Sequence, residues 1–270
     1  MRRAEVDLAM DWAAAEGWNP GIHDADCFHA ADPDGFLLGL LEDEPIGGIS
    51  VVAYDERFGF LGLYIVRPEY RGRGFGIALW NAGMARLGAR NIGLDGVVEQ
   101  QPNYRRAGFA LAYRNERYEG VGGGMAPDGV VALSQVGFDG IAHYDARMFG
   151  VRRPAFLERW LAQPRSQARA VVTDGALSGY GMIRACRHGH KIGPLFADSP
   201  DLAEALYASL VAGVPGEPVF LDVPQANADA VALAQRHHMR PVFQTARMYR
   251  GGDPAIPVER VFGVTTFELG

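Results

Sequence analysis

The stretch that decides the fold is Leu63–Leu79, which reads LYIVRPEYRGRGFGIAL. It begins within an apolar, aromatic-rich run, residues 60–66, which predicts a buried strand. Pro68 ends this strand because proline has no N–H to continue a ladder of hydrogen bonds. A glycine-rich turn, residues 71–76, comes next, and the apolar residues after it predict a helix over residues 77–90.

A strand, a glycine-rich turn and a helix in this order are typical of an anion-binding site. The start of a helix presents free N–H groups and the positive end of the helix dipole. Gly72, Gly74 and Gly76 have no Cβ, so a phosphate can approach the main chain closely. Arg71 and Arg73 add positive charge. The alternative is a tight structural turn whose arginines face solvent.

Two common phosphate-binding motifs do not fit this turn. A P-loop ends in Gly-Lys-Ser/Thr, and the turn has neither a lysine nor a hydroxyl there. A dinucleotide fingerprint needs G-x-G-x-x-G, and the third glycine is missing whether the count starts at Gly72 or at Gly74. The turn therefore predicts a different phosphate-containing ligand.

The turn resembles the acyl-CoA signature of the GNAT acetyltransferases, R/Q-x-x-G-x-G/A. Arg71, Gly74 and Gly76 occupy the motif positions, and residues 66–71 (VRPEYR) supply the usual hydrophobic-x-Pro-x-Tyr-Arg lead-in. A second landmark of the family, Tyr-x-x-x-Gly-Phe, is present over Tyr104–Phe109. The resemblance is strong over residues 60–118.

The resemblance implies acetyl-CoA as the cosubstrate and no metal. In the family, the amides of the turn hold the CoA pyrophosphate, and the preceding strand pairs with pantetheine. A backbone N–H polarises the thioester carbonyl where the central strand splays, which the resemblance places near Ile65 and Val66. Asn103 either bonds pantetheine or caps its own helix. The implied cofactor-binding residues are Tyr64, Ile65, Val66, Arg71, Gly72, Arg73, Gly74, Phe75, Gly76 and Asn103.

Length and composition predict a globular chain of two domains. At 270 residues it is long for one compact domain, and its contents of 48% apolar and 21% charged residues are ordinary. Cys27 and Cys186 form no disulfide framework and lack metal-ligand spacing. No apolar run approaches the ~20 residues of a membrane span, and Glu5 and Asp7 interrupt any signal-peptide core. We therefore expect a cytoplasmic protein with no membrane partner.

The charge distribution points to a small anionic ligand. A net charge of −6 argues against nucleic acid as a partner. Residues 67–117 nevertheless contain nine arginines against four acidic residues. This span includes the glycine-rich turn, so a polyanionic cofactor is the natural interpretation.

The element order of the first half is that of a GNAT domain, and the second half resembles a degenerate copy of the first. We expect an α/β (α+β) protein of tandem GNAT folds, each a mixed, mostly antiparallel central sheet flanked by helices. Residues 1–128 form the domain with the acyl-CoA site, and residues 129–270 form a degenerate domain that contributes to the acceptor pocket. A glycine-rich linker is predicted at residues 120–129. Outside the stretch already described, the predicted helices are 3–16, 24–31, 103–109, 200–211 and 227–237, and the predicted strands are 36–41, 46–52, 92–98, 111–118, 171–173, 180–186, 192–196, 219–223 and 241–249.

The second half lacks the glycine-rich turn. Residues 197–200 (ADSP) stand in its place, and negative charge there would repel pyrophosphate. Asp222 falls at the place equivalent to Asp95, and Arg247 roughly at the place equivalent to Arg117. The whole chain also resembles the two-domain YitH-type acetyltransferases, through weaker motifs at 17–21, 145–153 and 262–270.

Acetyl transfer to an amine requires a neutral amine, a polarised carbonyl and a proton for the departing thiolate. Tyr104 is the candidate general acid, with simple packing against the cofactor as the alternative. The base stays open among Asp26, Glu99, Asp95 and a water chain. The resemblance places Trp18, Asn19 and Asp24 on a loop above the acceptor pocket, where a structural turn is an equal alternative. The candidate substrate residues are Trp18, Asn19, Asp24, Asp26 and Glu99.

The acceptor is predicted to be a primary amine of a small molecule or a peptide, and the protein a monomer or homodimer. A runner-up hypothesis is a non-catalytic acyl-CoA-binding sensor that keeps the GNAT fold. A pure interaction scaffold would require the glycine-rich turn to be a coincidence, so we discount it.

Overall fold

The structure, a computed structural model, describes residues 1–270. The elements of the first half are α1 (Arg3–Ala15), α2 (Asp24–Ala31), β1 (Phe36–Leu41), β2 (Glu44–Ala53), β3 (Phe58–Val66), α3 (Phe75–Leu87), β4 (Asn91–Val97), α4 (Gln101–Arg106) and β5 (Ala110–Val121). Those of the second half are β6 (Val131–Ala132), α5 (Phe138–Phe149), α6 (Pro154–Leu161), β7 (Ser166–Thr173), β8 (Ala176–Ala185), β9 (His190–Ala197), α7 (Pro200–Val211), β10 (Pro218–Pro224), α8 (Ala228–Arg236), β11 (Arg240–Arg250) and β12 (Val261–Gly263).

These elements confirm the predicted α/β fold with a mostly antiparallel sheet flanked by helices. Helix α3 begins two residues earlier than predicted because Gly74, with φ +87°, is its N-cap. It ends at Leu87 because Gly88 adopts φ +61°. No element was predicted between residues 130 and 165, where the structure has α5 and α6. The left-handed Gly150 ends α5, and Pro154 occupies the first turn of α6.

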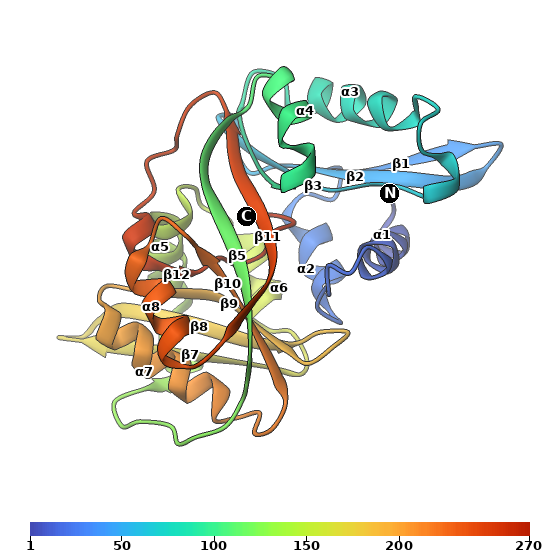
Figure 1. The fold of residues 1–270 in the computed structure, drawn as a ribbon. Helices are drawn as coiled ribbons and strands as arrows, with labels where there is room; N and C mark the ends of the chain where they lie inside the picture. The colour runs from blue at the N-terminus through green and yellow to red at the C-terminus, as the bar shows by residue number, and fades with distance from the viewer.

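The two halves exchange their last strands, and this exchange joins all twelve strands into one sheet (Figure 1). The order is β1-β2-β3-β4-β11-β5-β10-β9-β8-β7-β6, and β12 pairs with β9. Strand β11, from the second half, lies between β4 and β5, while β5, from the first half, lies between β11 and β10. Neither half therefore has a complete sheet without the other.

Two buried ion pairs hold the exchanged strands. Arg117 on β5 lies directly opposite Asp222 on β10 and donates to it from Nε and Nη2 at 2.6 and 2.8 Å. Arg247 on β11 lies opposite Asp95 on β4 and donates from the same two atoms at 2.8 and 2.5 Å. The sequence places Asp95 and Asp222 at equivalent positions of the two halves, and likewise Arg117 and Arg247. In the structure, the aspartate of each half binds the arginine of the other half.

The segment predicted to be a linker is partly ordered structure. Gly120 and Val121 complete β5. The N–H groups of Gly122 and Gly123 donate to the carbonyls of Glu217 and Val211, each at 2.8 Å. The predicted boundary at residue 128 lies in the connection between β5 and β6, although the exchanged strands tie the two halves together in space.

Packing at the junction between the halves brings the end of the chain into the centre of the molecule. Residues 261–270 are all buried. Arg153, just before α6, forms a buried bidentate pair with Asp145 of α5, with both distances 2.8 Å. Its Nη2 also donates to Thr265 Oγ1 at 2.8 Å, and its Nη1 donates to the carbonyl of Gly270 at 3.4 Å. The C-terminal segment is therefore held rigidly beside the strands of the first half.

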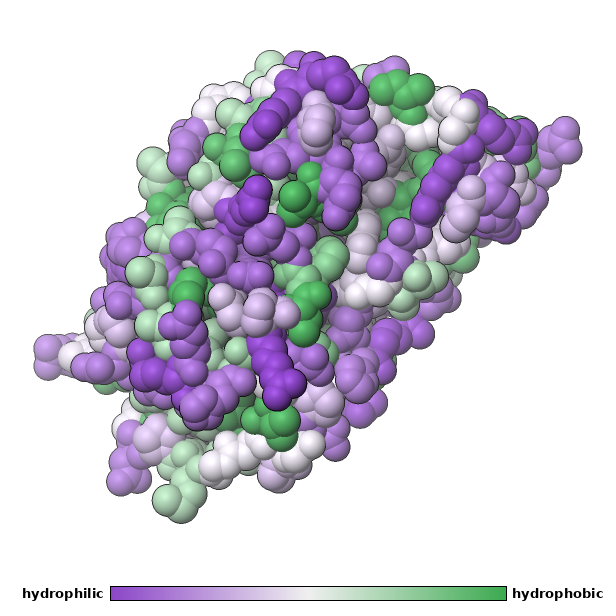
Figure 2. Space-filling model, in the orientation of Figure 1, coloured by the Kyte–Doolittle hydropathy of each residue, from purple (hydrophilic) through white to green (hydrophobic).

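The surface in Figure 2 shows apolar side chains scattered among polar ones, without one large apolar patch on that face. No helix is both long enough and apolar enough to cross a membrane.

We expect Asp222→Asn to destabilise the whole protein, because it leaves the buried Arg117 guanidinium without a counter-charge. Removal of one partner of a buried pair costs about 3–5 kcal/mol, measured as the free energy of unfolding in urea. Asp11→Asn is the matched control, since it breaks the exposed Arg187–Asp11 pair and should have little effect. Equal stabilities of the two variants would show that the Arg117–Asp222 pair does not hold the exchanged strands.

We expect a fragment of residues 1–124 to aggregate and to lack activity. It would contain β5 without either of its neighbours, so two unpaired strand edges and their apolar faces would be exposed. Solubility, size-exclusion chromatography and acyl-transfer assays beside the full chain measure this. A soluble fragment as active as the full chain would contradict a pocket built by both halves.

Candidate active site

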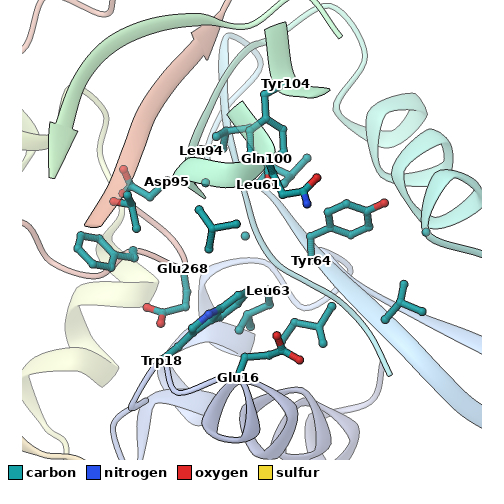
Figure 3. Close-up of a pocket in the computed structure, with 18 of the residues that line it drawn as sticks. Glu16, Trp18, Leu61, Leu63, Tyr64, Leu94, Asp95, Gln100, Tyr104 and Glu268 are labelled. Atoms are coloured by element: carbon teal, nitrogen blue, oxygen red, sulfur yellow. The ribbon is translucent and has the colours of Figure 1, made fainter. Parts of the chain in front are cut away.

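The candidate active site is a cavity of about 460 Å³ that opens where β3 and β4 separate (Figure 3). The two strands pair in parallel only from Phe58↔Asn91 to Leu61↔Leu94, although both continue beyond that point. Strand β4 instead keeps pairing with β11, from Ile92 to Val97. The diverging strands leave a wedge-shaped space at the ends of β3 and β4.

A β-bulge in β3 causes this divergence. Gly48 and Ser50 of β2 pair with Ile65 and Gly62, so two residues of β3 oppose the single residue between them on β2. One of the two, Leu63, has φ +44°, which is rare for a residue other than glycine. Bulges bend strands and often lie beside functional sites. We expected the strand to splay near Ile65 and Val66, and pairing with β4 in fact stops after Leu61.

The cavity wall combines both halves of the chain. Its lining residues are Glu16, Trp18, Leu61, Gly62, Leu63, Tyr64, Ile65, Val66, Arg71, Gly72, Gly76, Leu94, Asp95, Gly96, Val97, Gln100, Tyr104, Phe243, Thr245, Phe267 and Glu268. In Figure 3, Tyr104 and Tyr64 lie on one side of the cavity, and Trp18 and Glu268 lie on the opposite side.

The glycine-rich turn presents free backbone donors at the cavity edge. Gly72 and Gly74 adopt φ +72° and +87°, and a Cβ at either position would meet no atom within 4 Å. None of the N–H groups of residues 72–77 donates to a protein acceptor. These amides lie at the start of α3, where the helix dipole favours an anion. The turn therefore has the open donors that a pyrophosphate requires.

The two arginines of the turn have different surroundings. Arg71 Nε donates to the carbonyl of Val66 at 2.7 Å, and its Nη2 binds Glu16, the C-cap of α1. It therefore holds the turn against the end of β3. The guanidinium of Arg73 lies over the rings of Tyr70 and Phe75, 5.6 and 5.1 Å from their centroids.

Tyr104 is a buried wall residue of the cavity. Its ring stacks on Trp80 with centroids 5.8 Å apart and fits against Gly96, where a Cβ would lie 2.1 Å from the ring. Burial, with a smaller effect of Tyr64, raises the pKa of Tyr104 to about 12. The hydroxyl therefore stays protonated at neutral pH.

Asn103 does not lie in the cavity wall. Its Nδ2 donates to Gln100 Oε1 at 2.5 Å, and its Oδ1 accepts from Arg106. The alternative role as a helix cap is wrong, because α4 begins at Gln101 with Gln100 as its N-cap. Gln100 itself lines the cavity.

Of the predicted acceptor residues, only Trp18 lines the cavity. Asp24 is buried in a pair with Arg184 of β8, at 2.8 and 3.0 Å, and also accepts from the N–H of Gly21. The side chain of Asn19 bonds the backbone of His188. These two residues therefore hold the loop in place instead of facing the cavity.

The remaining candidate bases also differ in position. Asp26 is exposed and pairs with Arg3, and Glu99 is exposed outside the cavity wall. Asp95 does line the cavity, but its oxygens accept from Arg247 and Asn115.

Several wall residues were not among the predicted site residues. They come from the C-cap of α1, η2 (Val98–Gln100), β11 and the C-terminal segment, and they are Glu16, Gln100, Phe243, Thr245, Phe267 and Glu268. The strand exchange and the buried C-terminal segment bring them there, and neither has a local sequence signal.

Comparison with known proteins agrees with this geometry. A sequence model described as "Acetyltransferase (GNAT) family" matches residues 5–111, and one described as "Acetyltransferase (GNAT) domain" matches residues 141–263. The holothin acyltransferase of Pseudoalteromonas sp. (strain SANK 73390) is 31% identical over 269 residues, which cover 98% of this chain and 92% of that protein. The chain belongs to the GNAT acyltransferase family.

Two further relatives support the tandem GNAT arrangement. The uncharacterized N-acetyltransferase YitH of Bacillus subtilis is 28% identical over 174 residues, which cover 62% of this chain and 61% of that protein. The crystal structure of a putative acetyltransferase from Pyrococcus horikoshii superposes with a TM-score of 0.86 at 23% identity, covering 100% of this chain and 94% of that one. This last likeness concerns the fold.

We expect Gly74→Val to abolish acetyl-CoA binding, measured by calorimetry, while circular dichroism stays native. The branched side chain would stand where a pyrophosphate approaches the free amides. Gly175→Val is a matched control, because Gly175 has a similar φ of +78° in an open turn between β7 and β8. Two CoA molecules bound per wild-type chain would contradict a single site in the first half.

Proposed function

We propose that this GNAT acyltransferase transfers an acetyl group from acetyl-CoA to a primary amine of a small molecule or peptide, by direct attack of the amine. The observation that carries the proposal is the continuity of the cavity. The glycine-rich turn, through Gly72 and Gly76, borders the same space as Tyr104 and Trp18. A donor bound at the turn and an acceptor entering past Trp18 would meet within one enclosure.

The residues around the turn suit the cofactor. The free amides of residues 72–77 would hold the pyrophosphate, and the edge of β3 that no longer pairs with β4 would face pantetheine. Acetyl-CoA supplies an activated thioester. Unpaired backbone N–H groups at the bulge of β3 are the candidate donors to its carbonyl oxygen.

The second half keeps the fold of a CoA site without its donors. Asp198 stands at the start of α7, where it accepts from the Tyr144 hydroxyl at 2.6 Å and binds Arg260. Ser199 caps the helix by accepting from the N–H of Leu202. The carboxylate and the satisfied cap support a single CoA site per chain, located in the first half.

Tyr104 is proposed as the general acid. It lies on the same side of the cavity as Tyr64, and its raised pKa keeps the proton on the hydroxyl until the thiolate departs (Figure 3). Because that pKa is above the ordinary value, the protonated form persists from pH 6 to 9. Loss of activity from ionisation of Tyr104 is expected only as the pH approaches a pKa of about 12.

We expect Tyr104→Phe to lower kcat on the order of 10²-fold, the lower range for general acid catalysis. Acetyl-CoA affinity should barely change, because a proton donated only in the transition state adds nothing to ground-state binding. Single-turnover measurements from pH 6 to 9 isolate the chemical step. An unchanged rate would make Tyr104 a packing residue.

The deciding experiment is an assay of CoA release with amines, amino acids, polyamines, peptides and holothin as acceptors, with holothin included because of the relative's name. Turnover with an amine supports the enzyme. Tight binding of acetyl-CoA without release of CoA for any acceptor would favour the alternative, a non-catalytic acyl-CoA-binding sensor.

A further inference from the structure

We propose that Glu268, in the C-terminal segment, binds the N–H groups of the acceptor amine, and that the acceptor carries its amine on a compact apolar body. The inference deepens the proposed function and rests on it for the identity of the acceptor. Glu268 lies in a half that holds no CoA turn, five residues after the end of β12.

Glu268 has one oxygen that is free to bind a ligand. The residue is 4% exposed and lines the cavity. Its Oε2 accepts from Thr266 Oγ1 at 2.5 Å, whereas no protein group donates to Oε1. Some polar side-chain atoms without a hydrogen-bond partner are fully enclosed by the protein, but Glu268 Oε1 is not one of them. Oε1 is therefore accessible from the cavity. A buried carboxylate oxygen without a donor favours a ligand that supplies one.

The other two carboxylates of the cavity are already occupied. Glu16 binds Arg71, next to the glycine-rich turn. Asp95 accepts from Arg247 and from Asn115. Of the three, Glu16 is exposed to solvent, so Glu268 is the buried carboxylate with an oxygen that accepts from no protein group. It lies on the Trp18 side of the cavity, away from Tyr104 (Figure 3).

The charged groups behind Glu268 leave Oε1 unoccupied. Arg117 and Arg184 are bound bidentately by Asp222 and Asp24. The buried Lys191 donates to the carbonyl of Asn19 at 2.9 Å. The three cations therefore balance the charges of Asp222, Asp24 and Glu268. This balance lowers the free-energy cost of burying the Glu268 carboxylate, although no cation donates a hydrogen bond to Oε1.

The surroundings of Glu268 set the shape of the ligand. Trp18, Phe243 and Phe267 are aromatic residues of the same wall. The backbone of Glu268 cannot retreat, because its carbonyl oxygen lies only 2.0 Å from where a Cβ at Gly62 would stand. A rigid carboxylate in an aromatic wall selects a primary amine on an apolar body over a polyanion or a sugar.

The test measures amine recognition without turnover. Hexylamine and its neutral counterpart hexanol are titrated by calorimetry into the protein saturated with CoA. We expect the wild type to bind hexylamine about ten- to a hundredfold more tightly than hexanol, as for a hydrogen bond to a charged group. Glu268→Gln keeps the shape and the bond from Thr266, and should reduce this ratio to near one.

Two further variants make the result interpretable. Glu158→Gln removes an exposed carboxylate of α6 and should keep the wild-type ratio. Glu268→Asp keeps the charge of the cluster but withdraws the carboxylate by one methylene, so it should lower the ratio even if Glu268→Gln fails to fold. Acetyl-CoA affinity should stay unchanged in every variant that folds.

The outcomes separate this proposal from the proposed function. No preference for hexylamine in the wild type, or an unchanged ratio in the folded Glu268 variants, overturns the role of Glu268 whether or not amines are acetylated. If Glu268→Gln loses the preference for hexylamine over hexanol but the wild type acetylates no amine, the result supports the binding role and overturns the transferase proposal. If Glu268→Gln loses this preference and also has a lower kcat/KM for an accepted amine, the result supports the binding role and the transferase proposal.

Discussion

The rest of the structure depends on the pairing of Arg117 with Asp222 across the exchanged strands β5 and β10. A buried bidentate pair of this kind is costly unless both partners are present and fully hydrogen-bonded. The pair therefore selects the arrangement in which β5 leaves its own half. Its counterpart, Arg247 with Asp95, does the same for β11. Together they favour one continuous sheet over two separate ones.

The same arginine links the exchange to the active site. Arg117 Nη1 donates to the carbonyl of Trp18 at 2.7 Å. Its guanidinium also lies 4.9 Å from the ring centroid of Phe267 and 5.7 Å from that of Phe243. One side chain thus holds the exchanged strand, the acceptor-side loop and two aromatic walls of the cavity. This arrangement explains how a half without a CoA turn contributes residues to the wall of the cavity.

The two sides of the cavity differ in the groups that line them: main-chain amides on one side, and side chains on the other. On the side proposed for the cofactor, the free donors are main-chain amides fixed by helix α3 and by glycines with positive φ. On the side proposed for the acceptor, the wall consists of side chains held by buried ion pairs and by the C-terminal segment. The first side is local in sequence, whereas the second requires the complete fold.

The sequence by itself determined the cofactor side. The residues from Leu63 to Leu79 predicted the strand, the turn and the helix because proline, glycine and apolar periodicity act within a few residues. The position of Tyr104 beside the cavity agrees with its helix spacing, and its role as an acid stays a prediction. Only the tertiary structure decided the acceptor side. Asp24 and Asn19 are polar residues on the right loop, but ion pairing and hydrogen bonds with the second half turn them away from the cavity. Glu268 is brought there by strand exchange and burial of the chain end, which are contacts between residues some 200 positions apart that no local pattern encodes.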